Sequence, residues 1–268
     1  MPVLHIVVLA LVQGITEFLP ISSSGHLALV PILTDWPDQG LVIDIAVHVG
    51  TLGAVLLYFW RDIFGMIRGL WMLLRGRSDP YARLAGLLIL STIPVIVAGY
   101  ALNEYATVSL RSLNVIAWAT LGFGIVLWIT DKVGMTLRRV EHLGIGDALL
   151  IGLMQVLALI PGTSRSGITM SAARLLGMGR TDAARFSMLL SIPTILGAGT
   201  LAGLELYETG DVQLTTDAFI AAGLAFIMAI IAIAFLMAWL RRSSFTPFVV
   251  YRIILGCGLL GLSYGYLG

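Results

Sequence analysis

Two apolar stretches of this chain are interrupted by nearly the same polar segment, 142 residues apart. The first interruption reads Pro20-Ile-Ser-Ser-Ser-Gly-His26, and the second reads Pro161-Gly-Thr-Ser-Arg-Ser-Gly-Ile-Thr169. A shift of 142 residues aligns Gln13 with Gln155, Ser22 with Ser164, Ser24 with Ser166 and Gly25 with Gly167. Irregular backbone survives at membrane depth only where protein or a wet cavity surrounds it. Such paired interruptions therefore indicate a binding site shared by two halves of a membrane protein.

The composition identifies the class of protein. Hydrophobic residues make up 58% of the 268 and charged residues 12%, against roughly 45–50% and about 25% in soluble domains. A bilayer core needs about 20 apolar residues per helix, and six segments qualify, residues 41–60, 81–102, 113–130, 183–206, 218–240 and 247–267. Residues 3–33 and 146–178 are too long for one crossing and contain the interruptions. We predict an all-α polytopic membrane protein in which these two regions are re-entrant helix–loop–helix hairpins.

The charged loops support this topology. Twelve basic residues lie on one face of it, namely Arg61, Arg68, Arg75, Arg77, Arg83, Lys132, Arg138, Arg139, Arg180, Arg185, Arg241 and Arg242. The opposite face has one basic residue, Arg111, among the acidic residues Asp35, Asp38, Glu104, Glu205, Glu208, Asp211 and Asp217. The positive-inside rule places the basic face in the cytoplasm and both termini outside. The sorting would be lost if either hairpin were a full crossing.

The number of spans between the hairpins predicts how the two halves are related. Three spans separate the hairpins, and an odd number of crossings inverts the membrane orientation of the second hairpin relative to the first. We predict an inverted-topology repeat. Its first half is residues 1–130, with hairpin 3–33 and three spans, and its second half is residues 131–268, with hairpin 146–178 and three spans.

The first hairpin carries groups suited to acid–base chemistry and anion binding. Gln13 and Glu17 are four residues apart and so lie one helical turn apart on the same face. Ser22, Ser23 and Ser24 supply hydroxyls, Gly25 permits unusual backbone angles, and His26 begins the returning half-helix. The free N–H groups at the start of that half-helix favour an anion.

The second hairpin supplies the complement. Its hydroxyls come from Thr163, Ser164, Ser166 and Thr169, and Gly167 again loosens the backbone. Arg165 is a permanently charged fork suited to phosphate or carboxylate. Together the two hairpins predict a site for an anionic oxygen group, phosphate above all. Two structural alternatives stay open, because Arg165 can form a purely structural ion pair with Glu17 and a Ser/Gly interruption can be a mere kink.

Other polar residues are assigned no chemistry. We interpret His48 as a satisfied core histidine, Asp147 as a helix cap, and Arg174 and Arg252 as side chains that extend to the interface. Two glycine pairs with GxxxG spacing are compatible with a homodimer; they are Gly199 with Gly203 and Gly261 with Gly265.

The two interruptions resemble the signature motifs of the bacterial undecaprenyl-diphosphate phosphatase family, also called the bacitracin-resistance family. Residues 13–26 resemble its first motif, and residues 161–169 resemble its Pro-Gly-x-Ser-Arg-Ser-x-x-Thr motif. The segments 187–193 and 251–253 are also similar, so the resemblance extends over the chain. Position 13 departs from the pattern, because it is Gln where some relatives carry Glu. A second carboxylate for a metal site is therefore missing.

The resemblance implies a bacterial plasma-membrane enzyme that removes the terminal phosphate of a C55 polyprenyl diphosphate and confers bacitracin tolerance. In the mechanism we expect, Arg165 and the half-helix N-termini hold the diphosphate. Ser23 or water attacks, His26 is the acid–base group or an alternative nucleophile, and Glu17 orients His26 or binds Mg²⁺ or Ca²⁺. Gln13 and the hydroxyl and glycine positions of both hairpins line the substrate site.

Two other classes of protein remain open. One is a transporter or flippase of an anionic lipid or small anion, because paired hairpins are transporter architecture. The other is a structural membrane subunit, which the cost of a buried Arg disfavours.

Overall fold

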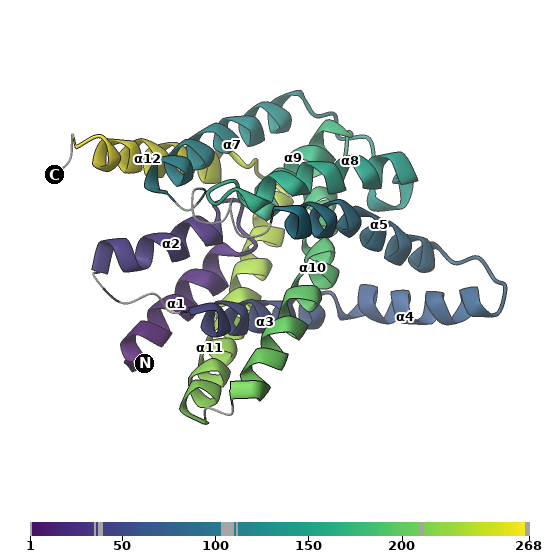
Figure 1. Cartoon of the computed structure of the whole chain (residues 1–268). Coiled ribbons are helices and arrows are strands. Elements are labelled where there is room, and N and C mark those ends of the chain that lie inside the picture. The colour runs from purple at the N-terminus through teal and green to yellow at the C-terminus, as the bar shows by residue number, and fades with distance from the viewer. Residues whose placement is uncertain are drawn as a thin grey trace.

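The computed structural model describes residues 2–34, 36, 40–102, 110, 112–209 and 212–265, and these residues form an all-helical protein (Figure 1). The helices are α1 Val3–Thr16, α2 Ser23–Thr34, α3 Gly40–Tyr58, α4 Trp60–Leu74, α5 Pro80–Ala101, α7 Leu113–Val133, η1 Val140–His142, α8 Ile145–Val156, η2 Leu157–Leu159, α9 Arg165–Leu175, α10 Arg180–Thr209, α11 Val212–Leu240 and α12 Thr246–Ser263. Over the same residues the extended backbone pairing is a single bridge between Arg138 and Met178.

The predicted spans are helices in the structure. Within the described residues, four helices are long and apolar enough to cross a bilayer by themselves, and these are α5, α7, α11 and α12. A bend of 81° separates the apolar part of α3 from α4, an amphipathic helix with Phe64, Ile67 and Trp71 exposed. The predicted span 183–206 lies within α10. The expectation of an all-α, multi-pass membrane protein is confirmed.

The second hairpin begins and ends on the same side of the molecule. It consists of α8, the short helix η2, an irregular break at residues 160–164, and α9. Arg138 binds the Asp147 carboxylate at the start of α8 and the Leu176 carbonyl at the end of α9. Asp147 also accepts the N–H of Gly144 at 2.8 Å, so its prediction as a helix cap is confirmed.

The first hairpin has the same form. α1 and α2 are separated by a break at residues 17–22, and the ring of His5, near the start of α1, lies 4.7 Å from that of Trp36, just beyond α2. The start of α1 packs beside the start of α11, where Ile6 and Ala218 share a buried cluster. The basic loops lie toward the other end of α11, where Leu240 accepts a hydrogen bond from Thr181 at the start of α10.

The two hairpins pack reciprocally on the opposite half. α1 contacts α11, and α8 contacts α5. A glycine permits the close approach at each crossing, because a Cβ atom on Gly14 would lie 2.7 Å from the Ala225 carbonyl and one on Gly152 would lie 2.6 Å from the Ser91 carbonyl. A two-fold repeat requires this reciprocal packing of each hairpin on a helix of the other half. The inverted relation of the halves and their boundary at residue 130 stay predictions.

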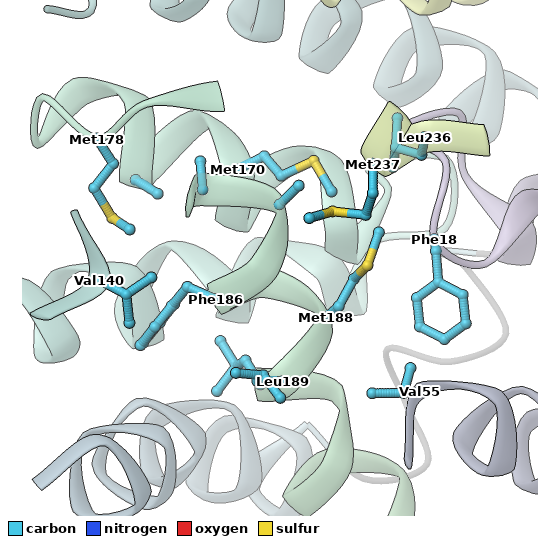
Figure 2. Close-up of a cluster of buried hydrophobic side chains, with 14 of the residues drawn as sticks. Phe18, Val55, Val140, Met170, Met178, Phe186, Met188, Leu189, Leu236 and Met237 are labelled. Atoms are coloured by element: carbon cyan, nitrogen blue, oxygen red, sulfur yellow. The ribbon is translucent and has the colours of Figure 1, made fainter. Parts of the chain in front are cut away.

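The largest cluster of buried hydrophobic side chains is rich in methionine (Figure 2). Met170 of α9, Met188 of α10 and Met237 of α11 are buried together with Phe18, which follows α1, and Val55 of α3. Methionine is unbranched and fills irregular gaps. The core therefore joins both hairpins to α3, α10 and α11 and gives the breaks a packed base.

Ion pairs join the helix ends on the basic face. Arg185 of α10 binds Asp62 of α4 and, at 3.3 Å, Glu141 of η1. Arg174 was expected to extend to the interface, and this is wrong, because it is 1% exposed and donates to the carbonyls of Asp131 and Gly134. Several predicted outer-face charges, Asp35, Asp38, Glu104, Arg111 and Asp211, lie outside the described residues, as do the side chains of Glu205 and Glu208.

Candidate active site

Each break contains a serine whose backbone is in the left-handed conformation. Ser22 has φ 76° and Ser164 has φ 72°, and among the described residues these are the non-glycine positions with positive φ. Such a conformation costs about 1–3 kcal/mol. Each hydroxyl offsets part of this cost by accepting the N–H three residues later, that of Gly25 at 3.3 Å and that of Gly167 at 3.1 Å. The two breaks thus have matching local structures at the positions that the 142-residue shift aligns.

The breaks contact each other directly. The Ser166 hydroxyl of the second hairpin donates to the Leu19 carbonyl of the first at 3.0 Å. A Cβ atom on Gly25 would lie 3.5 Å from the Gly162 Cα. The two tips therefore meet inside the protein, as the sequence predicted.

Arg252 of α12 holds both breaks from behind. We expected this side chain to extend to the interface, and the structure shows otherwise, because Arg252 is 0% exposed. Its guanidinium donates to five carbonyls, those of Pro20 in the first break, Gly162 and Thr163 in the second break, and Ala119 and Thr120 of α7. This side chain is a buried crosslink between the two halves.

Glu17 is the centre of the polar contacts at the tips. Its Oε2 accepts hydrogen bonds from the Gln13 amide at 2.9 Å and the Ser23 hydroxyl at 2.6 Å. Its Oε1 accepts one from Arg165 Nη2 at 2.9 Å. The ion pair that we left open as a structural alternative is thus present. It nevertheless lies at the wall of a cavity rather than in a sealed core.

That cavity has a volume of about 320 Å³, near the lower limit for small-molecule pockets. The sequence-predicted residues that line it are Glu17, Ser23, Ser24, Ser164 and Arg165. The remaining lining residues come from α3, η2 and α10, and are Asp44, Ile45, His48, Ala158, Thr194 and Ile195. Two carboxylates, one guanidinium, an imidazole and several hydroxyls therefore line a space bordered by apolar side chains.

The other predicted site residues support this wall from behind. Gln13 is buried and reaches the cavity only through Glu17. Ser22, Thr163, Ser166 and Thr169 are buried with their breaks and half-helices, and the Thr169 hydroxyl lies 2.6 Å from that of Ser187 on α10. The N–H groups of Gly25 and Gly167 donate to the hydroxyls of the left-handed serines, Ser22 and Ser164.

His26 points away from the cavity. Its Nδ1 lies 2.6 Å from the Ser22 carbonyl and its Nε2 lies 2.6 Å from the Tyr251 hydroxyl. A carbonyl can only accept, so Nδ1 carries the proton and Nε2 accepts the Tyr251 O–H. Both ring nitrogens are therefore used within the protein, and the structure places this histidine against α12 instead of beside Glu17.

His48 was missed as a site residue, and its prediction as a core histidine is wrong. Its side chain is 31% exposed in the cavity, and its Nε2 lies 3.6 Å from Glu17 Oε2. A signal was present in the sequence, because Asp44 and His48 are two polar residues one turn apart in an apolar helix, as Gln13 and Glu17 are. That pattern does not show toward which neighbour the His48 side chain points, and this orientation is what brings His48 to the site.

The residues at the tips do not by themselves fit a divalent cation. The described part of the chain contains no group of three or more His, Cys, Asp and Glu side chains placed to hold a metal ion. Glu17, the expected ligand, already accepts three hydrogen bonds from groups that can only be donors to it. We therefore assign no metal to Glu17 and derive no step through one.

A second cavity, of about 420 Å³, lies at the basic face between α5, η1 and α10. Its Arg185 is neutralised by Asp62 and Glu141, and its Arg83 donates to the Leu143 carbonyl. It lacks the convergent reactive groups of the cavity at the tips. Only the latter is a candidate active site.

Comparisons with known proteins find relatives that match this chain over nearly its whole length. Residues 6–258 match the family described as "Bacitracin resistance protein BacA". The chain is 55% identical to "Undecaprenyl-diphosphatase 1" of Rhodospirillum rubrum over 98% of this chain and 96% of that protein. It is 53% identical to "Undecaprenyl-diphosphatase" of Ruegeria pomeroyi over 98% and 100%, and 55% identical to the protein of that name from Jannaschia sp. over 96% and 97%.

Proposed function

The chain belongs to the bacitracin resistance protein BacA family and is a membrane phosphatase that acts on undecaprenyl diphosphate; we propose that the cavity around Glu17 is its active site. The products are undecaprenyl phosphate, the lipid carrier of cell-wall synthesis, and inorganic phosphate. The observation that carries the assignment of the site is the continuous contact of Ser23 with Glu17 and of Glu17 with Arg165 at the cavity wall.

Arg165 is the proposed binding group for the terminal phosphate. One of its N–H groups is used by Glu17 and one by the Ser187 carbonyl at 3.2 Å, which leaves the others of the fork for phosphate oxygens. Its side chain is 14% exposed, so its charge is little screened by water. Preorganised donors in such a place stabilise the charge that develops on a transferring phosphoryl group.

Ser23 is the proposed nucleophile and Glu17 its base. The Ser23 oxygen attacks the terminal phosphorus, the bond from that phosphorus to the bridging oxygen breaks, and undecaprenyl phosphate leaves with the electron pair. The Ser23 proton passes to Glu17 Oε2, 2.6 Å away. Arg165 on the other carboxylate oxygen keeps Glu17 ionised until the proton arrives. His26 is a positioning residue in this scheme, because its contacts are with Ser22 and Tyr251.

The test is phosphate release from undecaprenyl diphosphate by the purified protein in detergent. Glu17→Gln, Arg165→Ala and Ser23→Ala should each reduce release by at least about 100-fold. Ser78→Ala is the control, because Ser78 is exposed in the loop between α4 and α5 and does not line the cavity at the tips. Its rate should stay near that of the unchanged protein. Near-normal release by Ser23→Ala would exclude Ser23 as nucleophile, and near-normal release by Glu17→Gln or Arg165→Ala would place the site elsewhere.

The same preparation addresses the finer predictions. Loss of activity in EDTA would support the expected Mg²⁺ or Ca²⁺, held chiefly by the substrate. A transporter or flippase needs charge matching but no attacking group, so unchanged lipid movement in Ser23→Ala would favour that alternative.

We also propose that the basic face is cytoplasmic, in the bacterial plasma membrane, with the termini and substrate access outside. Labelling of single cysteines from each side tests this orientation. The homodimer stays a prediction, and size-exclusion chromatography in detergent tests it.

A further inference from the structure

His48 stands out among the described histidines because its ring borders the active-site cavity. The other groups there are held by one another, since Ser23, Gln13 and Arg165 all donate to Glu17. The His48 Nε2 lies 3.6 Å from Glu17 Oε2, longer than a hydrogen bond, and the side chain is 31% exposed. The ring is therefore placed to contact a molecule in the cavity.

The backbone fixes which nitrogen of His48 is reactive. Nδ1 lies 2.6 Å from the Asp44 carbonyl one turn earlier in α3. A carbonyl oxygen only accepts, so Nδ1 carries the hydrogen and the lone pair is on Nε2. Nε2 is thus a proton acceptor directed into the cavity. In His26 the equivalent nitrogen is used by the Tyr251 hydroxyl.

The charges around His48 suit a proton acceptor. Glu17 from the first break, Arg165 from α9 and Asp44 on its own helix line the cavity with it, and α10 contributes the uncharged Thr194 and Ile195. The other titratable groups of the helices packed against α3, such as His5 of α1 and Asp217 of α11, are not lining residues. Once Glu17 has returned its proton to the Ser23 oxygen, its carboxylate lies 3.6 Å from the protonated Nε2 and stabilises the imidazolium.

We propose that His48 is a further catalytic residue, the base that activates water to hydrolyse the phosphorylated Ser23. Water attacks the phosphorus, its proton passes to His48 Nε2, and the bond between phosphorus and the Ser23 oxygen breaks. That oxygen recovers from Glu17 the proton it lost in the first step, and inorganic phosphate is released. His48 then returns its proton to the solvent. This assignment rests on the proposed Ser23 nucleophile.

The two half-reactions can be separated experimentally. His48→Gln keeps a hydrogen-bonding side chain but removes the basic nitrogen. With undecaprenyl diphosphate labelled in its terminal phosphate, a rapid quench should show one equivalent of undecaprenyl phosphate formed at the normal rate and the label retained on Ser23. Steady-state phosphate release should fall by about 100-fold or more. His142→Gln, in η1 on the basic face, is the matched control and should behave like the unchanged protein.

A second variant distinguishes loss of the base from a folding defect. In His48→Ala the labelled protein should lose its phosphate faster as imidazole is added, because the free base enters the space that the ring occupied. The rate should rise with the basicity of substituted imidazoles of equal size.

The outcomes distinguish this inference from the assignment of Ser23. Steady-state release by His48→Gln within about tenfold of normal, or equal loss of the first product burst and of turnover, overturns the role of His48 alone. Turnover with no labelled protein in any variant overturns the Ser23 step and, with it, this inference. A trapped Ser23 phosphate that imidazole discharges supports both.

Discussion

Replacement of Arg252 tests whether the two breaks depend on one buried crosslink. The guanidinium donates to the carbonyls of Pro20, Gly162 and Thr163, which lie in the breaks and outside the helical hydrogen-bond pattern. Its bonds to Ala119 and Thr120 reach carbonyls that α7 already uses. Arg252→Met keeps most of the side-chain volume and removes every donor. Three buried carbonyls then lose their hydrogen-bond donor.

The magnitude can be worked out from these three bonds. A hydrogen bond to a charged group contributes a net ~1.5–3 kcal/mol, so three bonds at the lower end of that range give a loss of about 4.5 kcal/mol of unfolding free energy. Arg252→Lys should lose about half as much, because one ammonium has fewer donors and cannot reach both breaks at once. Native proteins are stable by about 5–15 kcal/mol, so both changes are measurable.

Unfolding by SDS titration in mixed micelles, followed by circular dichroism, gives the comparison. Arg242→Met is the matched control, since Arg242 is exposed in the turn between α11 and α12, and its unfolding free energy should change by less than about 0.5 kcal/mol. A loss below about 1 kcal/mol for Arg252→Met would refute the reasoning. It would mean that the breaks hold their shape through the left-handed serines and core packing alone.

Two further substitutions probe close contacts. Gly50→Ala should lower the unfolding free energy by at least about 2 kcal/mol in the same titration, because its Cβ would clash with the Ala222 carbonyl where α3 packs on α11. Gly122→Ala is the control, because the space there is open, and it should be neutral or slightly stabilising. Equal effects of the two substitutions would contradict the prediction. Gln13→Glu would place a second carboxylate against Glu17, where the amide now donates at 2.9 Å. Phosphate release by this variant should fall without divalent cation and recover with added Mg²⁺ by a larger factor than in the unchanged protein, and an identical Mg²⁺ response would be the contrary result.

The helices and the two breaks were predictable because their signals are local. A run of about 20 apolar residues has few alternatives to a membrane helix, and a Ser/Gly segment inside such a run cannot continue it without cost. The pairing of Ser22 with Ser164 was also visible, since both precede a glycine by three residues. Their left-handed backbone gives that pairing a structural meaning.

The roles of His26, His48 and Arg252 were not predictable from spacing. Each depends on a partner far away in the sequence, respectively Tyr251, Glu17 and the carbonyls of both breaks. A motif predicts that His26 is near the tip but not which way its ring turns. An arginine near a helix end can extend to the interface, and only the packing of α12 against α7 shows that Arg252 turns inward.

The asymmetry of the repeat explains why the site needs both halves. The 142-residue shift aligns Glu17 with Leu159 and Ser23 with Arg165, so the second break lacks the carboxylate and the proposed nucleophile of the first. A symmetric pair of tips would set two carboxylates against a diphosphate, with no fixed positive charge to offset them. Arg165 supplies that charge at the position where a second serine would stand, and it reaches Glu17 across the interface at 2.9 Å. The left-handed serines give the two tips matching backbones, and the unmatched residues between them form the proposed active site.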